Sequence, residues 1–227
     1  MKTADTILRD VSKNPHNLVK TGFSRLDEMA FLTEGNISLA AGRPGMGKTM
    51  LAANIAANLI MQRAEVCYIS PEHPGKEIVD RVLAAGKASE DRLPYLYVDD
   101  TPYTALKGRT LLEKIRSECP NVKLIIIDYV QLIGTSLIQW LCDAFPTAAV
   151  LVLSQVSRAV EFREEHRVSL ADIADINDMA PYLYCIASLY RDDYYNDSDE
   201  PNHTMEVTDL RTRQSAVLMV DGHSLHD

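Results

Sequence analysis

An eight-residue stretch near the start of the chain has the residue types and spacing of a phosphate-binding loop. It consists of Gly42, Arg43, Pro44, Gly45, Met46, Gly47, Lys48 and Thr49, and it matches G-x-x-x-x-G-K-[ST] at every fixed position. The glycines let backbone N–H groups turn toward phosphate oxygens. Lys48 offers a positive charge to the β- and γ-phosphates, and the Thr49 hydroxyl can ligate Mg²⁺. The loop therefore predicts binding of a nucleoside triphosphate with Mg²⁺.

The residues on either side of this loop favour the same interpretation. Residues 36–41 form a short apolar run typical of a buried strand, and residues 50–60 are rich in alanine and typical of a helix. Strand, loop and helix in this order are the context that a phosphate-binding loop requires. The positive end of the helix dipole would then face the phosphate.

Two carboxylates stand at or just after the ends of predicted strands. A protein that binds a nucleoside triphosphate with Mg²⁺ needs acidic residues at such positions. Asp128 ends the almost continuous apolar run 122–128, which is typical of a central parallel strand covered on both faces. An acid at that position can hold Mg²⁺, directly or through water. Glu72 follows the run 65–70 and could orient and deprotonate an attacking water. On position alone, a solvated turn residue explains Glu72 equally well.

Three further polar residues are candidates for contact with the terminal phosphate. Gln155 comes just after the apolar run 148–154 and could sense the γ-phosphate by hydrogen bonding, or simply cap the strand. Arg211 and Arg213 stand two residues apart. On a strand, both side chains would point to the same face and could share one target. The alternative for this pair is an exposed basic edge that prevents pairing with another strand.

Composition limits the kinds of protein that this chain can be. Its 227 residues carry 23 Lys and Arg against 32 Asp and Glu, a formal net charge of -9, which excludes nucleic-acid binding by bulk charge. A local basic channel between subunits is compatible with that charge. The four cysteines form no C-x-x-C pair and are expected to be buried thiols. With no apolar leader and no apolar run long enough for a bilayer, we expect a cytoplasmic protein without a membrane partner.

The alternation of apolar runs with helical stretches predicts an α/β fold, with a mostly parallel twisted sheet flanked by helices. Further strands are expected over residues 95–98 and 183–190, and helices over residues 75–86, 105–118 and 136–144. Residues 157–180 are expected to be irregular, and residues 192–203 to form a polar loop. The β-like runs 204–210 and 216–220 predict a C-terminal antiparallel hairpin.

The domain organisation that we expect is simple. Residues 1–20 would form a linker-like helix and an approach segment, and residues 21–227 one nucleotide-binding domain. Within the first segment, residues 4–13 place three apolar side chains on one helical face, namely Ile7, Leu8 and Val11. That face could pack on a neighbouring subunit or on the chain's own core.

Several short motifs occur in the order seen in one family of ATPases. They are TGFSRLDE at 21–28, ISPE at 69–72 with Arg81 beyond, DDTP at 99–102, IDYVQL at 127–132, SQ at 154–155 and YRD at 190–192. The chain resembles a RecA-like P-loop ATPase domain. The order of the motifs is similar to that in the C-terminal motor domain of DnaB-type replicative helicases, from about residue 21 to residue 220.

The resemblance implies a role for each candidate residue. These roles are phosphate contact by Lys48, Mg²⁺ ligation by Thr49 and Asp128, base catalysis by Glu72 and γ-phosphate sensing by Gln155. Arg211 and Arg213 stand where the family has a Lys-x-Arg pair that reaches the ATP of the neighbouring subunit. The resemblance further implies ATP hydrolysis by an oligomer, such as a hexamer, that acts on single-stranded DNA.

The departures from the family concern DNA rather than ATP. Residues 133–147 are too few for the family's long first channel loop. The nearest equivalent of its second channel loop, residues 171–178, has no basic residue, whereas backbone binding depends on cations. Arg158, Arg163 and Arg167 lie nearby in the sequence and could compensate. The family's Asn-Gly-Pro turn is missing from the shortened C-terminal segment. Since the resemblance begins near residue 21, we expect no N-terminal domain of the kind that organises a helicase ring.

Three functions therefore fit the sequence. The first is an ATP-hydrolysing, DnaB-like motor that acts on single-stranded DNA as an oligomer. The second is a nucleotide-switched regulatory or assembly protein with weak or no translocation, which the short, acidic channel loops favour. The third is a non-catalytic partner that binds ATP structurally or poisons a cognate ring, and the filled catalytic positions count against it.

Overall fold

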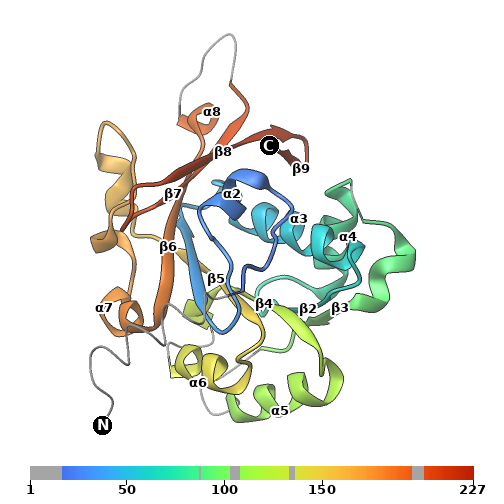
Figure 1. Ribbon diagram of the computed structural model, residues 1–227. Coiled ribbons are helices and arrows are strands. Elements are labelled where there is room, and N and C mark those ends of the chain that lie inside the picture. The colour runs from blue at the N-terminus through green and yellow to red at the C-terminus, as the bar shows by residue number, and fades with distance from the viewer. Residues whose placement is uncertain (1–16, 87, 103–107, 133–135, 196–201) are drawn as a thin grey trace.

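The computed structural model describes residues 17–86, 88–102, 108–132, 136–195 and 202–227 (Figure 1). Its described strands form one nine-stranded sheet in the order β3-β2-β4-β5-β1-β6-β7-β8-β9. They are β1 (Ile37–Gly42), β2 (Glu65–Ile69), β3 (Leu96–Asp99), β4 (Val122–Asp128), β5 (Ala149–Gln155), β6 (Leu183–Tyr190), β7 (Thr204–Asp209), β8 (Ser215–Asp221) and β9 (Ser224–His226). The strands from β3 to β6 in this order pair in parallel, and β7, β8 and β9 continue the sheet antiparallel.

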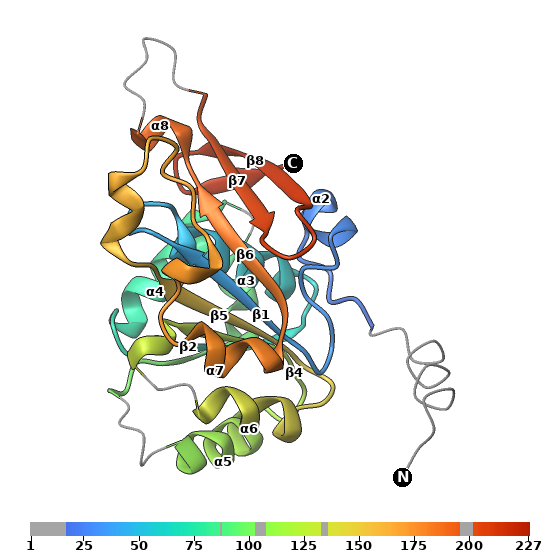
Figure 2. The same ribbon diagram turned by 90° about the vertical axis from the view of Figure 1, so that its left-hand side faces the viewer.

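The helices lie on both faces of this sheet. They are α2 (Ser24–Glu28), α3 (Lys48–Met61), α4 (Gly75–Ala84), α5 (Gly108–Glu118), α6 (Ser136–Ala144), α7 (Ile176–Met179) and α8 (Asp192–Tyr195). Figures 1 and 2 show α5 and α6 together at the bottom of the molecule, with α3 and α4 on the other side of the sheet. None of the helices in the described part of the chain is long and apolar enough to cross a membrane.

Alternating side chains divide the core into two layers. In β4, Leu124 and Ile126 pack into the layer under α3 and α4, while Ile125 and Ile127 pack into the layer under α5 and α6. Successive residues of a strand face opposite sides of the sheet, so a strand covered on both sides must be apolar throughout. This packing explains why the run 122–128 carries no polar residue between Lys123 and Asp128.

The predicted α/β fold with a mostly parallel sheet and a C-terminal hairpin is confirmed. Most predicted strands and helices lie within a few residues of their observed bounds. The short elements α2, α8 and β9 were not predicted, because each has five residues or fewer and shows no repeated pattern. Cys67, Cys119 and Cys185 are free, buried thiols, as expected. The predicted helix over residues 4–13 lies outside the described residues, so it stays a prediction, as does the domain boundary at residue 20.

Candidate nucleotide-binding site

One cleft lies at the carboxyl ends of β1, β2, β4 and β5, the edge at which parallel α/β sheets bind ligands. It has a volume of about 320 Å³ and contains most of the predicted site residues. Its walls are Pro44, Gly45, Gly47, Lys48, Thr49, Met50, Glu72, His73, Arg81, Asp128, Tyr129 and Gln155. The fold therefore brings together residues that are up to about a hundred positions apart in the sequence.

The phosphate-binding loop has a conformation that demands glycine at two positions. Gly47, the residue before α3, has a φ of 87°, and Gly45 has a φ of 86°, in the left-handed region. A Cβ on Gly47 would lie 2.4 Å from the Met205 methyl carbon, and one on Gly45 would lie 2.6 Å from the Tyr194 ring. The loop leads directly into α3, whose first N–H groups have no partner within the helix and suit an anion.

Lys48 is the cation at the centre of the loop. Its ammonium donates hydrogen bonds to the carbonyl oxygens of Gly42 (2.8 Å) and Arg43 (3.1 Å). Burial lowers the pKa of Lys48 to about 8, although the charges of Asp128 and Glu72 oppose this shift. Phosphate groups beside the ammonium would favour its charged form, so the side chain is suited to an anionic ligand.

Thr49 and Asp128 form the part of the site that suits a metal ion. The Thr49 hydroxyl donates a 2.9 Å hydrogen bond to Asp128 Oδ2, and the Tyr68 hydroxyl donates to the same oxygen at 3.0 Å. Asp128 is almost fully buried at the end of β4. Mg²⁺ is typically held by one or two protein oxygens together with phosphate oxygens. The hydroxyl and carboxylate oxygens therefore fit Mg²⁺, and the assignment of Thr49 and Asp128 as its ligands stays a prediction.

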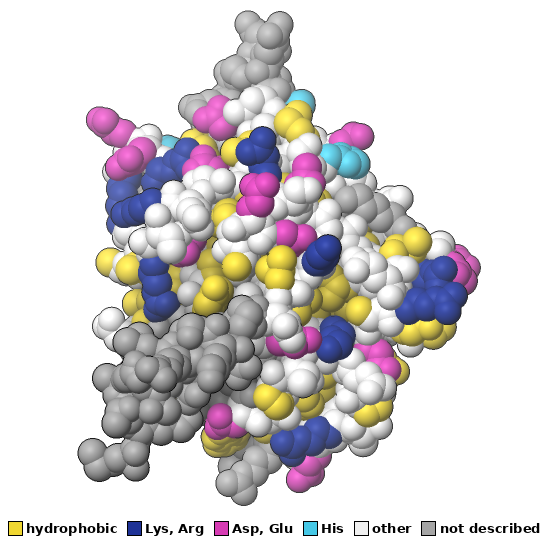
Figure 3. Space-filling view, in the orientation of Figure 1, with side chains coloured by type: hydrophobic (Ala, Val, Ile, Leu, Met, Phe, Trp, Pro, Cys, Tyr) yellow, Lys and Arg dark blue, Asp and Glu magenta, His cyan; other side chains and the backbone are white. Residues whose placement is uncertain are grey.

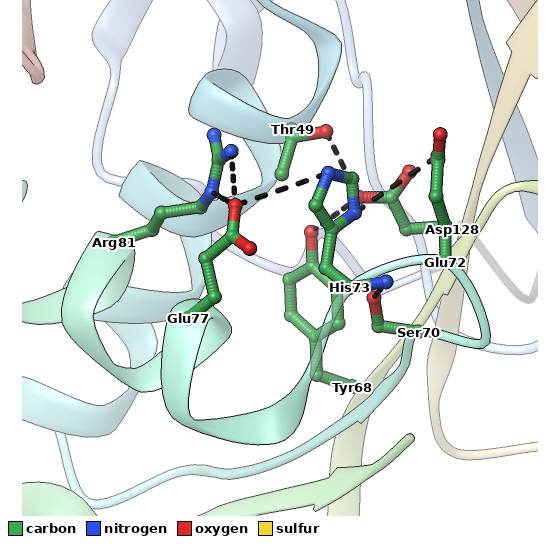
Figure 4. Close-up of polar contacts among 8 residues, drawn as sticks. All are labelled: Thr49, Tyr68, Ser70, Glu72, His73, Glu77, Arg81 and Asp128. Carbon is green, nitrogen blue, oxygen red and sulfur yellow. Dashed lines mark hydrogen bonds and ion pairs between the residues drawn. The ribbon is translucent and has the colours of Figure 1, made fainter. Parts of the chain in front are cut away.

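Glu72 lies in the turn between β2 and α4, next to His73 and Glu77, which the sequence had not indicated, and near Arg81, which belongs to the motifs named above. Figure 4 shows His73 between Glu72 and Glu77, and Glu72 lines the same cleft as Asp128. Arg81, one turn further along α4, donates to Glu77 Oε1 at 2.6 and 3.1 Å. The i,i+4 spacing of Glu77 and Arg81 is a signal that could have revealed this pair from the sequence.

Gln155 ends β5 at the wall of the cleft. The Gln131 side-chain amide donates to Ser154 Oγ (2.9 Å) and to the Gln155 carbonyl oxygen (3.2 Å), and these bonds tie the end of β5 to the segment after β4. The Gln155 side chain is thus placed where it can reach a ligand. Its role as a γ-phosphate sensor stays a prediction.

Arg43 belongs to the predicted phosphate-binding stretch, but its side chain is not among those lining the cleft. Its Nε donates to Glu161 Oε1 at 2.6 Å, and Nη1 donates to the Val156 carbonyl oxygen at 3.2 Å. The Tyr195 hydroxyl also donates to Glu161, at 3.4 Å. Arg43 therefore ties the phosphate-binding loop to the segment that follows β5, while its carbonyl oxygen accepts a hydrogen bond from Lys48.

The structure corrects the prediction that Arg211 and Arg213 lie on a strand with both side chains on one face. β7 ends at Asp209, and both arginines lie in the turn before β8. The Asp209 carboxylate accepts hydrogen bonds from the Arg211 N–H (2.9 Å) and the Thr212 hydroxyl (2.8 Å), which closes the turn, and Arg213 has a φ of 64°. The same-face argument for a shared target is therefore wrong.

Arg211 makes contacts within its own chain. Its guanidinium donates to the carbonyl oxygens of Leu183 (2.6 Å) and Ala180 (2.7 Å), at the start of β6. Arg213 is exposed, and neither arginine lines the cleft. The two residues thus differ in their surroundings, and a role of either one at a neighbouring subunit stays a prediction.

The order of the strands in the sheet, the phosphate-binding loop and the two acidic residues of the cleft together define a class of protein. The phosphate-binding loop connects β1 to α3, Asp128 ends β4, and Glu72 follows β2 in a nine-stranded, mostly parallel sheet. These are the features of a RecA-like P-loop ATPase domain.

Comparison with known proteins defines the type of ATPase domain more closely. Residues 19–92 match the family described as DnaB-like helicase C terminal domain. The replicative DNA helicase DnaB of Geobacillus stearothermophilus is 29% identical over 88% of this chain and 53% of that protein. A probable plasmid replicative DNA helicase of Chlamydia psittaci is 31% identical over 78% of this chain and 47% of that protein. The chain thus spans about half the length of the curated relatives that it matches.

Solved structures agree with these sequence relatives. One solved ATPase domain superposes with a TM-score of 0.77 at 25% identity, covering 98% of this chain and 96% of that one. A DnaB-like replicative helicase that was studied with its primase interactions superposes with a TM-score of 0.78 at 22% identity, covering 99% of this chain and 67% of that one. The chain is therefore similar, over nearly all of its length, to the ATPase domain of DnaB-like replicative helicases.

Proposed function

We propose that this chain hydrolyses ATP with Mg²⁺ and works as an oligomeric motor on single-stranded DNA in the cytoplasm. The observation that carries the proposal is the hydrogen bond of Thr49 to Asp128, in a cleft that also holds Lys48 and Glu72. One site then contains the phosphate-binding loop, an acidic residue that can ligate the metal ion and a candidate general base. The replicative helicases similar to this chain support DNA as the substrate of the motor.

The residues divide the work of phosphoryl transfer between them. Lys48 would bind the β- and γ-phosphates, and Thr49 and Asp128 would hold Mg²⁺, which when bound would supply positive charge to the phosphate oxygens. Glu72 accepts a proton from the attacking water, whose oxygen bonds to the γ-phosphorus as the bond to the β-phosphate oxygen breaks. Gln155 donates a hydrogen bond to the γ-phosphate.

Oligomer formation supplies a further cation to the cleft of each chain. Among the described residues that line the cleft, the Lys and Arg side chains are Lys48 and Arg81, and Arg81 is paired with Glu77. A cation from outside stabilises the charge that develops in phosphoryl transfer. Arg213 is exposed on the β7–β8 turn and is the residue that we assign to the neighbouring subunit's site, while Arg211 supports the turn.

A nucleotide-switched regulator or assembly protein is the second candidate, because two of the three arginines near the predicted channel loop have acidic partners. Arg163 binds both oxygens of Asp172, at 2.6 and 2.7 Å, and Arg167 pairs with Glu206 at 2.7 Å. Figure 3 shows Lys and Arg side chains on the left of the molecule with Asp and Glu side chains among them. Such paired cations release fewer counterions from DNA than free ones.

Steady-state ATP hydrolysis, measured with and without single-stranded DNA at low and moderate salt, tests the proposal. We expect hydrolysis that DNA stimulates more strongly at low salt. Hydrolysis that is indifferent to DNA at both salt concentrations would support the nucleotide-switched regulator instead. Absence of hydrolysis in all four conditions would contradict both functions and favour a non-catalytic partner.

A further inference from the structure

His73 lies between two carboxylates at the wall of the nucleotide cleft (Figure 4). Its Nδ1 is 3.9 Å from Glu72 Oε2, and its Nε2 is 4.0 Å from Glu77 Oε1. Nδ1 is buried and has no hydrogen-bond partner among the residues that the structure describes. Buried polar atoms are normally satisfied, so an unpartnered nitrogen that faces the candidate base requires an explanation.

The backbone holds the imidazole in this place from two sides. The His73 N–H donates to the Ser70 hydroxyl at 3.3 Å, just after β2. At the other end of the turn, Gly75 begins α4, and its N–H donates to Asp100 Oδ2 at 2.8 Å. The turn that carries both Glu72 and His73 is therefore held at both ends.

Glu77 gives the imidazole an ionised neighbour on its far side. Both hydrogen bonds from Arg81 go to Glu77 Oε1, the same oxygen that faces His73. The hydrogen bond to Arg81 is the main cause that lowers the pKa of Glu77, so this carboxylate stays charged. A carboxylate beside one ring nitrogen orients the imidazole and determines which nitrogen carries the proton.

We propose that His73 is a positioning residue that links Glu72 to the Glu77–Arg81 pair and holds the Glu72 carboxylate toward the γ-phosphate. This inference rests on the proposed hydrolysis of ATP at the same site. With a proton on each ring nitrogen, His73 can donate to Glu72 and Glu77 at once. Both contacts, at 3.9 and 4.0 Å, are longer than hydrogen bonds, and contacts of this kind commonly tighten when substrate binds.

The surroundings of the His73 side chain differ from those of a turn residue that is fully exposed to solvent. The His73 side chain is 22% exposed, and its nearest acidic oxygens come from two elements, the turn after β2 and helix α4. The other charged groups that line the cleft are Lys48, Arg81 and Asp128. His73 thus lies between Glu72 and Glu77 in the cleft that also contains Asp128, the candidate Mg²⁺ ligand.

NMR of the His73 ring at one fixed pH tests the contacts without any need for turnover. We expect the chemical shifts of the His73 ring to change in Glu72→Gln and in Glu77→Gln, because each substitution removes a carboxylate oxygen that lies 3.9 or 4.0 Å from a ring nitrogen. His226, exposed on β9, serves as the internal reference, and its ring signals should stay the same. His73 ring signals that are unchanged in Glu72→Gln would overturn the proposal.

Kinetic measurements distinguish a positioning role of His73 from a general effect of the substitution on the structure. We expect His73→Met to lower kcat for ATP hydrolysis about tenfold with KM changed less than about twofold, and to have no further effect in a Glu72→Gln background. His226→Met is the matched control and should leave turnover unchanged. If His73→Met lowers kcat equally in the wild-type and Glu72→Gln proteins, or lowers it in neither, the link between His73 and Glu72 is refuted. A wild-type protein that hydrolyses no ATP would refute the proposed function, while the NMR comparison would still decide whether His73 contacts Glu72.

Discussion

The Thr49 hydroxyl and Asp128 Oδ2 are joined by a 2.9 Å hydrogen bond, although the residues are 79 positions apart. The contact connects the first turn of α3 to the carboxyl end of β4. It is possible because β4, β5 and β1 lie side by side in the sheet, which brings their carboxyl ends to the same edge. The relative position of loop and acid therefore depends on the core of the protein and not on a flexible surface segment.

Tyr68 should matter to this contact even though it lies outside the cleft. Its hydroxyl is fully buried in β2 and donates to the same Asp128 oxygen. We expect Tyr68→Phe to lower the free energy of unfolding by about 1–2 kcal/mol, because it removes a donor from a buried carboxylate. ATP hydrolysis should slow while nucleotide binding is retained. Urea unfolding and turnover measure the two effects, with Tyr97→Phe on β3 as the control. Unchanged stability and turnover would show that the Tyr68 hydroxyl is dispensable.

Lys48 should be indispensable for turnover. The β- and γ-phosphates lose their principal cation in Lys48→Ala, so we expect hydrolysis to be abolished and nucleotide binding to weaken. The protein should still fold, because the two carbonyl oxygens that Lys48 binds lie next to an open cleft and can bind water. Lys76→Ala, at a highly exposed position of α4, is the control and should hydrolyse ATP normally. Turnover that survives in Lys48→Ala would contradict the phosphate-loop assignment.

Glu72 should affect the chemical step and not binding. Glu72→Gln preserves the shape of the side chain and removes its ability to accept a proton. We expect nucleotide affinity to be retained and hydrolysis to fall about 10²-fold or more. Fluorescent nucleotide binding and phosphate release measured on the same preparation separate the two effects. Near-normal phosphate release would mean that Glu72 is a solvated turn residue and not the catalytic base.

The sequence predicted the parts of this site that depend on local pattern. The loop from Gly42 to Thr49 is a contiguous motif, and Asp128 ends an uninterrupted apolar run, so both could be recognised without coordinates. His73 could not, because its contact with Glu77 depends on the angle at which α4 leaves the turn after β2. Tyr68 provided a weak signal, since a tyrosine inside a fully buried strand needs a partner for its hydroxyl.

The arginine pair shows why a strand end is hard to predict. The buried side chains of β7 alternate at Met205, Val207 and Asp209, and Leu210 breaks this alternation by packing on the opposite side of the sheet. One residue out of phase is too little to locate the end of a strand from the sequence. The end is set by the Asp209 carboxylate, which accepts two hydrogen bonds from the following turn. A side chain that bonds to its own backbone two residues on competes with the strand ladder, and this competition placed Arg211 and Arg213 in a turn.

Asp172 should make stability depend on pH in the acid range. The hydrogen bonds from Arg163, followed by those from Ser169, lower the pKa of this buried carboxyl to about 2 from an ordinary value of 3.8. The unfolded chain therefore takes up the proton at a higher pH than the folded one. The stabilisation is complete above pH 3.8 and is lost as the pH falls toward 2.

Replacing Asp172 by Asn isolates the contribution of the ionised Asp172 carboxylate to the free energy of unfolding. At pH 6 we expect Asp172→Asn to be less stable than wild type by about 2 kcal/mol, and the difference to shrink as the pH approaches 2. Urea unfolding at a series of pH values measures it. Asp178→Asn, an exposed position in α7, is the control and should show little difference at any pH. A difference between wild type and Asp172→Asn that is constant over this range would contradict the assigned ion pair.

Mixing of inactive variants tests whether Arg213 acts on a neighbouring subunit. If each site combines Lys48 of one subunit with Arg213 of the next, Lys48→Ala and Arg213→Ala will each be inactive alone. In an equal mixture, the intact Arg213 of one variant can meet the intact Lys48 of the other at about a quarter of the interfaces. We therefore expect the mixture to recover about a quarter of wild-type hydrolysis. A mixture of Lys48→Ala with Asp128→Asn should recover nothing, because both residues belong to the same subunit's site. Failure of the first mixture to recover activity, or full activity of Arg213→Ala alone, would remove Arg213 from the neighbouring site.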